Sequence, residues 1–343
     1  MRNKIYIFLL ILLSASTSLF AQQEAQFSQF MFNKLSFNPG YAGNDQKICF
    51  TGFGRQQWMG FTDANGDKTA PQTFLASLDA CLNFSNKTNF WSRSGIGLVV
   101  SSDKLGYEAT TTVRISYAYH VNVGAGKLGI GAQIGFLDKK IDYSKFVVSL
   151  GQPGDDPVIA AGLANNGGKP SNMFTDYAFG LYYQLPGKFY IGMSALNLSE
   201  PKGFPYTSTN GTTSTSGDAY NLDRTYYITG GYEYTFPSDP SFELDPHMLI
   251  QTDFTTTQYD IAAILKYNNK VWGGLSYRVQ DAITVILGWS PIPAWSFGYS
   301  YDITTSNMGG AGKSSGSHEI FAKYCFNISF PTYVKSYRNT RWL

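Results

Sequence analysis

The stretch "AITVILGWSPIPAWSFGYSYDI", residues 282–303, decides the fold class. On both sides of the turn sequence "PIP" (291–293), apolar or aromatic side chains mostly alternate with small or polar ones. Such alternation is typical of β-strands with one apolar face. Aromatic residues gather near the ends of that apolar face. The stretch therefore predicts a hairpin whose apolar face contacts lipid and whose other face contacts water.

The composition of the whole chain agrees with this interpretation. Aromatic residues make up 16% of the 343 residues and charged residues only 15%, against the usual fraction of about 25%. The mean hydropathy is −0.17, which a membrane barrel can have because only alternate residues meet lipid. A soluble secreted β-sandwich is the alternative, although its outer face would carry more Lys, Glu and Thr. We predict an all-β fold, a 14-stranded antiparallel transmembrane β-barrel with a short N-terminal helical or plug segment.

The same alternation recurs along the chain and defines the predicted strands. An even number of strands suits a closed barrel with both chain ends on one side of the membrane. The fourteen predicted strands are 46–58, 72–82, 95–103, 110–121, 127–138, 177–184, 189–198, 224–236, 242–253, 259–267, 271–279, 282–290, 294–303 and 317–326.

The lengths of the connections predict the orientation. If the first strand runs outward, the two very long connections, 139–176 and 199–223, both lie outside. The inner turns, apart from 83–94, then have five residues or fewer. Short periplasmic turns and long extracellular loops are typical of bacterial outer-membrane barrels.

The first residues predict export. Arg2 and Lys4 precede the apolar run Ile5–Leu13, and Ala21 is a suitable last residue of a signal peptide. We therefore expect an outer-membrane protein that contacts membrane lipid. Its predicted parts are a signal peptide (1–21), an N-terminal segment at the lumen or periplasmic mouth (22–45), the barrel (46–327) and a periplasmic tail (328–343).

Sequence motifs for catalysis or cofactors are weak. "GAGKLG" (124–129) has the spacing of a dinucleotide-binding turn, but a strand follows it where a phosphate site needs a helix. His120, His247 and His318 lie outside known catalytic histidine motifs. We expect no enzymatic activity, cofactor or metal, with a hydrolase site across barrel strands as the third-ranked alternative. The net charge of +2 gives no indication of nucleic-acid binding, and none is expected.

The segment "QFSQFMFNKLSFNPGYAGND" (26–45) is too aromatic for a linker. Its apolar residues have near-helical spacing until Asn38-Pro39 interrupts the pattern, which predicts a short amphipathic helix followed by a turn. We expect Phe27, Phe30, Met31 and Tyr41 to pack inside the barrel or at its periplasmic mouth. If these side chains stayed in water, each would lose a stabilisation on the order of 1.5–3 kcal/mol that burial provides. The alternative is a flexible tail that only a partner orders.

This segment resembles the N-terminal hallmark of the PorP/SprF family, F-S-Q-Y-M-F-N…N-P-A-Y-A-G. Phe30 replaces the usual Tyr and Gly40 the usual Ala. The ending "RNTRWL" (338–343) is similar to the family's R-N-x-R-F-L. The residues of the N-terminal motif are Phe27, Phe30, Met31, Phe32, Asn33, Asn38, Pro39, Tyr41 and Gly43.

The resemblance implies a non-enzymatic outer-membrane barrel of the type IX secretion system of Bacteroidota. Such a barrel binds and anchors, or helps to export, a large secreted or surface protein, for example a gliding adhesin, through the C-terminal domain of that cargo. It also implies other secretion components, or periplasmic components tied to peptidoglycan, as partners. A barrel transporter for a hydrophobic small molecule is the second-ranked alternative.

The outer loop 139–176 contains more apolar residues than a simple solvent-exposed connection would have. We expect it to be folded and to form much of the partner surface, whereas the Ser/Thr/Gly-rich stretch 205–220 reads as flexible. The alternative for loop 139–176 is that it folds inward and narrows the lumen. The candidate partner-binding residues are Phe146, Val147, Val148, Leu150, Val158, Ile159 and Leu163.

Three cysteines are expected near one another. Equal offsets around Asn65 place Cys49 opposite Cys81, and closure of the barrel brings Cys325 of the last strand next to the first strand. We expect all three to face the lumen near its periplasmic end. In an oxidising compartment the favoured bridge is Cys49–Cys81, which leaves Cys325 free. The alternative is three reduced cysteines.

Overall fold

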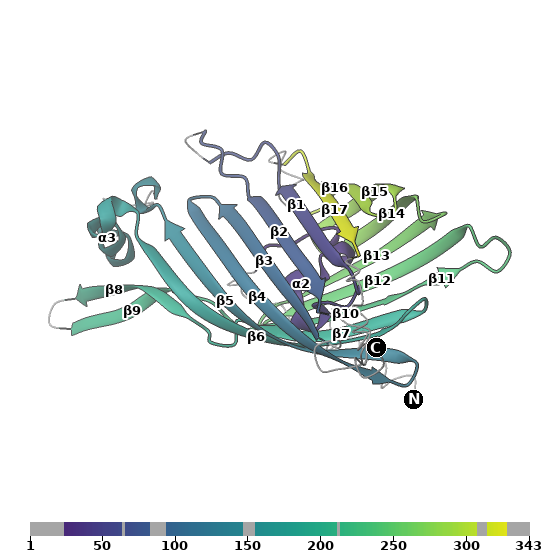
Figure 1. Ribbon diagram of the computed structural model, residues 1–343. Helices are drawn as coiled ribbons and strands as arrows, with labels where there is room; N and C mark the ends of the chain where they lie inside the picture. Colours follow the sequence, from purple (N-terminus) through teal and green to yellow (C-terminus); the bar gives the residue numbers. More distant parts are fainter. Residues whose placement is uncertain are drawn as a thin grey trace, which may run out of the picture.

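A single closed β-barrel makes up most of the computed structural model (Figure 1). The structure describes residues 24–63, 66–82, 94–146, 155–210, 213–306 and 314–327. The expected signal peptide (1–21) and periplasmic tail (328–343) lie outside these residues. Among the helices that are described, none is both long enough and apolar enough to cross a membrane.

Fourteen antiparallel strands form the described wall, in agreement with the predicted number. Each pairs with the next wall strand along the chain, and β1 pairs with β17 to close the ring. The strands are β1 (Ile48–Gln56), β2 (Gln72–Cys81), β3 (Ser94–Leu105), β4 (Glu108–Val123), β5 (Gly126–Ile141), β6 (Ser171–Leu185), β7 (Phe189–Leu196), β10 (Thr225–Tyr232) continued by β11 (Tyr234–Thr235), β12 (Phe242–Thr252), β13 (Thr257–Tyr267), β14 (Val271–Arg278), β15 (Ala282–Ile292), β16 (Trp295–Thr304) and β17 (Ser317–Phe326).

The remaining elements are not part of the wall and form three groups. The first group precedes β1 and consists of η1 (Phe30–Phe32), α2 (Lys34–Phe37) and η2 (Pro39–Tyr41). The second group connects β5 to β6 and consists of η4 (Tyr143–Lys145), α3 (Pro157–Ala164) and η6 (Asn166–Gly168). The third is a hairpin of β8 (Lys202–Asn210) and β9 (Thr213–Asn221) between β7 and β10.

The β8–β9 hairpin corrects the expectation of a flexible stretch over 205–220. Its Ser/Thr-rich sequence lacks the apolar alternation of a wall strand, so the pattern that found the other strands missed it. Thr and Tyr nevertheless favour extended backbone, and antiparallel pairing satisfies the backbone polar groups. The hairpin projects beside α3 in Figure 1.

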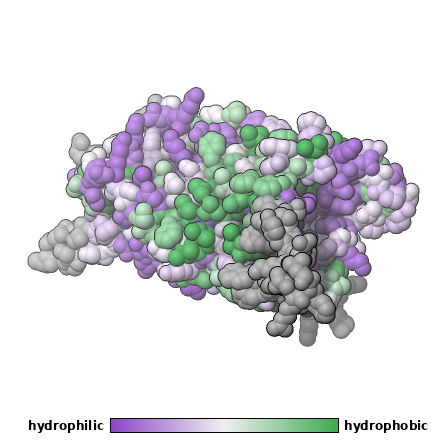
Figure 2. Space-filling view, viewed as in Figure 1, coloured by the Kyte–Doolittle hydropathy of each residue, from purple (hydrophilic) through white to green (hydrophobic). Residues whose placement is uncertain are grey.

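Side chains of the wall alternate as the sequence predicts. In β15, Ile283, Val285 and Leu287 point outward and are 37–57% exposed, whereas Thr284 and Ile286 point inward and are buried. Figure 2 shows the result as a band of hydrophobic residues across the middle of the visible face, with hydrophilic residues on both sides of it. This is the surface expected of a barrel wall in a bilayer.

The two ends of the barrel differ. We call the end that carries α3 and the β8–β9 hairpin the loop end, and the opposite end the turn end. Connections at the turn end include the short turns 124–125, 186–188, 268–270 and 293–294. The predicted six-residue outer loop 104–109 is instead a two-residue turn (106–107), because β3 and β4 extend beyond the apolar band.

Candidate functional site

The N-terminal segment, residues 24–45, fills the lumen, and we call it the plug. Its helical part consists of three single turns, η1, α2 and η2, in place of one amphipathic helix. The helical pattern ends at Phe37, as predicted, because Asn38 is extended and Pro39 begins the next turn. The Asn38 side chain accepts a 2.9 Å hydrogen bond from the Gly40 amide and so caps that turn.

Aromatic contacts show that the plug lies inside the ring. Its rings meet rings from strands on opposite arcs of the wall, which only a segment within the lumen can do. The expectation that Phe27, Phe30 and Met31 are buried is confirmed, since each is less than 9% exposed. The ring pairs are Phe27–Phe53 of β1 (5.4 Å), Phe32–Phe321 of β17 (4.7 Å), Phe32–Trp272 of β14 (5.5 Å), Phe37–Tyr227 of β10 (5.7 Å) and Tyr41–Tyr182 of β6 (5.2 Å).

Glycines of β5 and β6 make room for the Pro39-Gly40 turn. A Cβ on Gly131 would lie 2.3 Å from the carbonyl carbon of Pro39, and a Cβ on Gly40 would lie 2.9 Å from the carbonyl oxygens of Gly129 and Gly180. Such distances exclude any side chain unless the backbone moves. The plug backbone therefore lies directly against the wall at this level.

A buried ionic cluster holds the start of the plug, and we call it the latch. Arg55 of β1 forms ion pairs with Asp302 of β16 (2.8 Å) and Glu319 of β17 (3.0 Å). The backbone amides of Ser28 and Gln29 donate to Glu319 at 2.8 and 2.9 Å, and the Ser28 hydroxyl donates to Asp302 at 2.8 Å. Hydrogen bonds from the plug thus offset part of the free-energy cost of burying these carboxylates.

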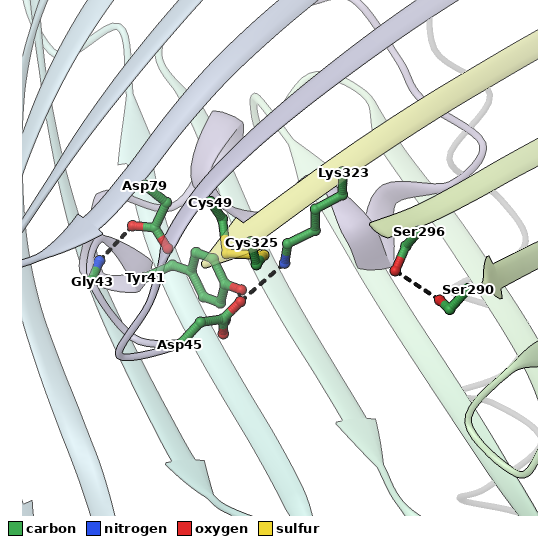
Figure 3. Close-up of a disulfide and its surroundings, with 9 residues drawn as sticks. All are labelled: Tyr41, Gly43, Asp45, Cys49, Asp79, Ser290, Ser296, Lys323 and Cys325. Atoms are coloured by element: carbon green, nitrogen blue, oxygen red, sulfur yellow. Dashed lines mark hydrogen bonds and ion pairs between the residues drawn. A yellow bond between two sulfur atoms is a disulfide. The ribbon is translucent and has the colours of Figure 1, made fainter. Parts of the chain in front are cut away.

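The end of the plug is fixed at the turn end (Figure 3). Asp45 accepts hydrogen bonds from the Tyr41 hydroxyl (2.9 Å) and the Lys323 ammonium (3.0 Å) of β17. Burial alone would raise the pKa of the Asp45 carboxyl. The nearby positive charge of Lys323 and the two hydrogen bonds outweigh burial, so its pKa falls to about 2.

A lysine of α2 lies among tyrosine rings. The Lys34 ammonium is 3.6 Å from the centre of the Tyr190 ring and 5.8 Å from those of Tyr41 and Tyr182. Burial lowers the pKa of Lys34 to about 8, although the charge of Asp45 acts in the opposite direction. The ring faces compensate part of the lost hydration of the ammonium.

The disulfide joins Cys49 of β1 to Cys325 of β17, with a Cα–Cα distance of 4.1 Å (Figure 3). This corrects the expected Cys49–Cys81 bridge, and Cys81 is the free cysteine. The physical reason is the register of β1. Cys49 pairs with Asp79 on the β2 side, two residues from the expected position, and directly with Cys325 on the β17 side.

At the loop end, the β5–β6 connection and the β8–β9 hairpin form one unit, which we call the platform. Ile159 of α3 packs in an apolar cluster with Phe204 of β8 and Tyr220 of β9, and inward-facing Leu137 and Phe174 join this cluster. The Asp156 side chain caps α3 by accepting hydrogen bonds of 2.8 and 3.1 Å from the backbone amides of residues 158 and 159. The described parts of the loop, 139–146 and 155–176, are therefore folded, as expected.

The candidate partner-binding residues have two outcomes. Phe146, Val158 and Leu163 pack on the platform cluster together with buried Ile159, whereas Val147, Val148 and Leu150 lie outside the described residues. The four described side chains hold the platform together. The hairpin residues Phe204 and Tyr220 complete the same cluster, and they were not identified from the sequence. Their aromatic character within a Thr-rich stretch was the available signal.

Cavities lie at both ends of the plug and share no lining residue. The turn-end cavity has a volume of about 780 Å³ and includes Asp45, Lys127 and Lys323. The loop-end cavity has a volume of about 430 Å³. Its lining combines aromatic, aliphatic and charged side chains, namely Glu24, Asp103, Leu105, Tyr107, Glu108, Leu137, Lys139, Phe146, Tyr220 and Leu222.

Comparison with known proteins gives the family. The family model described as type IX secretion system membrane protein PorP/SprF matches residues 19–324. The chain belongs to the PorP/SprF family. The resemblance noted in the plug sequence is thereby confirmed. The PorP/SprF match includes the plug and all of the wall except its last two residues, 325 and 326. No curated protein matches the sequence.

Comparison with solved structures finds other barrels of similar fold. The CymD monoaromatic hydrocarbon channel matches with a TM-score of 0.51 and 14% identity, over 87% of this chain and 94% of that chain. The Ralstonia pickettii toluene transporter TbuX matches with a TM-score of 0.48 and 11% identity, over 85% and 92%. At such identities the CymD likeness shows the fold alone. This PorP/SprF protein is an outer-membrane β-barrel.

Proposed function

We propose that the protein anchors an exported protein at the cell surface, or assists its export, and that the platform is the contact surface. The proposal takes its partner from the family, whose members belong to a secretion system. As the PorP/SprF resemblance implies, the C-terminal domain of the exported protein is the part that is bound. The protein acts by binding, without catalysis.

The observation that carries this proposal is the combination of a filled lumen with a folded platform. The plug contacts β1, β10, β14 and β17 through its aromatic rings, so it occupies the path that a solute would take. The platform rises beyond the wall at the loop end and has its own apolar cluster. A folded surface above a plugged barrel suits the holding of a macromolecule better than the conduction of a solute.

The test is co-purification from detergent-solubilised native membranes. The wild-type protein should elute with a large exported protein. A variant in which residues 206–217 of the hairpin are replaced by a two-residue turn should lose that protein, while Phe204 and Tyr220 stay in place to hold the platform. A variant with altered turn-end residues 268–270 is the control. Equal retention of the exported protein by both variants would reject the platform as the contact surface.

A transporter for a hydrophobic small molecule is the second candidate. The loop-end cavity favours it, because Tyr107, Phe146 and Tyr220 line a space large enough for a small aromatic solute. Charged Glu24, Asp103 and Glu108 line the same cavity, which weighs against it. Uptake of a monoaromatic hydrocarbon into liposomes that contain the purified barrel would support transport, and uptake no faster than in empty liposomes would exclude it.

A further inference from the structure

Charged side chains are almost absent from the outer face of the wall. Among the outward-facing residues of the described barrel strands, only Lys104, Asp138 and Lys140 are Asp, Glu, Lys or Arg. All three lie at the loop end of β3 and β5. An even scatter of interfacial charges would place some on the other strands, so their grouping indicates a local role.

The register places the two lysines in one row. Lys104 pairs with Ala109 of β4, and Ala109 pairs with Lys140 of β5. The lysines therefore stand two strand spacings apart, roughly 10 Å between Cα atoms. Ala109 between them has a short side chain, so both ammonium groups can reach a ligand in front of this row.

The row lies at the upper edge of the apolar band. The next row toward the membrane centre runs from Phe74 through Ser102, Thr111 and Asp138 to Met173. Phe74 and Met173 are 62% and 75% exposed, which marks them as lipid-facing side chains. Lysines just above such residues stand at the depth of lipid headgroups.

Two lysines at this place have no ion pair among the described residues, although the groove lining as a whole has as many carboxylates as lysines. Lys104 has no ion pair within the described part of the chain, and the same holds for Lys68, which lines with Lys104 a groove of about 310 Å³. Lys140 pairs with Asp138 at 3.1 Å, but its side chain stays 62% exposed. The carboxylates of the groove have their own partners, since Asp67 pairs with Lys145, Asp142 with Lys169 and Glu108 with Lys139.

We propose that Lys68, Lys104 and Lys140 form a binding site for the phosphate group of a membrane lipid in the leaflet at the loop end. Lys68 and Lys104 line the groove, and Lys140 lies in the same row as Lys104 with its side chain 62% exposed. Ammonium groups placed in this way suit a phosphate. The exposed apolar side chains directly below would contact the acyl chains of the same molecule. A lipid, unlike a soluble anion, makes both kinds of contact.

Native mass spectrometry of the purified barrel tests the site. The probes are lipid A, dephosphorylated lipid A with the same acyl chains, and inorganic phosphate, each added to delipidated protein in neutral detergent. The wild-type barrel should retain lipid A. The Lys104→Gln/Lys140→Gln variant should retain about tenfold less, whereas Lys188→Gln/Lys270→Gln, two exposed lysines of turn-end turns, should behave as wild type.

Three results would overturn the site. They are equal retention of lipid A by both double variants, equal retention of lipid A and its dephosphorylated form by the wild type, and displacement of lipid A by an equal concentration of inorganic phosphate. The last result would show that a free anion suffices. Heat-dependent electrophoretic mobility checks that each variant is folded, so a loss of lipid in a folded barrel reports on the site itself.

Discussion

The backbone amide of Ser28 donates a 2.8 Å hydrogen bond to the carboxylate of Glu319, which lies 291 residues later in the sequence. This bond connects the start of the plug to the last strand of the barrel. Arg55 of the first strand completes the arrangement by pairing with Glu319 at 3.0 Å. The plug, the first strand and the last strand thus meet at one buried ionic cluster, and the stability of each depends on the others.

Replacement of the latch cation should strongly destabilise the barrel. Arg55→Met leaves Glu319 buried without a cation and leaves Asp302 with only the longer ion pair to Arg278 (3.9 Å). The expected cost is about 3–5 kcal/mol in the free energy of unfolding. Urea unfolding in detergent micelles measures this. Arg224→Met is the control, because its ion pair with Glu200 is largely exposed and should contribute less than about 1 kcal/mol. Similar costs for both variants would contradict the role of the latch.

A side chain at Gly131 should displace the plug. Gly131→Val places a Cβ within 2.3–2.4 Å of the Pro39-Gly40 backbone, which neither segment can accommodate without moving. We expect the variant to show larger ion conductance in planar bilayers than the wild type. Gly52→Ala is the control, because its nearest neighbour would be 4.0 Å away. Unchanged conductance of a folded Gly131→Val barrel would show that the plug does not limit the passage of ions.

The disulfide between β1 and β17, where the barrel closes, should leave one free thiol. Thiol counting on the unreduced, denatured protein should give one thiol, and peptide mapping should recover Cys49 linked to Cys325. Cys325→Ser should lower the free energy of unfolding by about 2–5 kcal/mol, whereas Cys81→Ser should have little effect on it. A count of three thiols would contradict the disulfide, and a linked Cys49–Cys81 peptide would contradict the register of the first strand.

Acid should weaken the turn-end anchor of the plug. The pKa of Asp45 is about 2 in the folded protein, below its usual value of 3.8. Its contribution to stability is therefore present above pH 3.8 and is lost as the pH falls toward 2. The side chains of Asp45 and Lys323 are only 28% and 22% exposed, and the lowering of the pKa corresponds to an effect of roughly 2 kcal/mol.

Unfolding midpoints at pH 5 and pH 2.5 measure the contribution of Asp45. Asp45→Asn should be less stable than the wild type at pH 5 and should differ less from it at pH 2.5. Asp239→Asn, in a turn-end connection, is the control. A constant difference between Asp45→Asn and the wild type at both pH values would contradict the expected sign.

Much of the wall could be predicted from the sequence because each wall strand must present one face to lipid. Ile283, Val285 and Leu287 show this alternation directly. The β8–β9 hairpin could not be found in this way. Its strands pair with each other and pack through only a few aromatic residues such as Phe204 and Tyr220, so no lipid-facing alternation is required.

The plug and the disulfide also have features that the local sequence predicts and features that depend on closure of the barrel. Burial of Phe27 and Phe30 follows from their apolar character, but the identity of their neighbours follows from closure of the ring. The Cys49–Cys325 pair depends on the register between the first and last strands, which no local pattern reports. For the same reason the latch was missed, since its members Ser28, Arg55 and Glu319 meet only in the closed barrel.

Closure around the plug has a consequence for the order of assembly. The last strand, β17, carries both the seam cysteine and the partners of the first plug residues, so it completes the wall and its contents in the same step. A nascent chain that lacks this strand can neither close the wall nor form the hydrogen bonds that fix the start of the plug. We therefore expect the plug to be held in place only when the last strand of the wall has joined the first. Because contacts between such distant parts of the chain form slowly, we expect the pairing of β1 with β17 to be a slow step of folding.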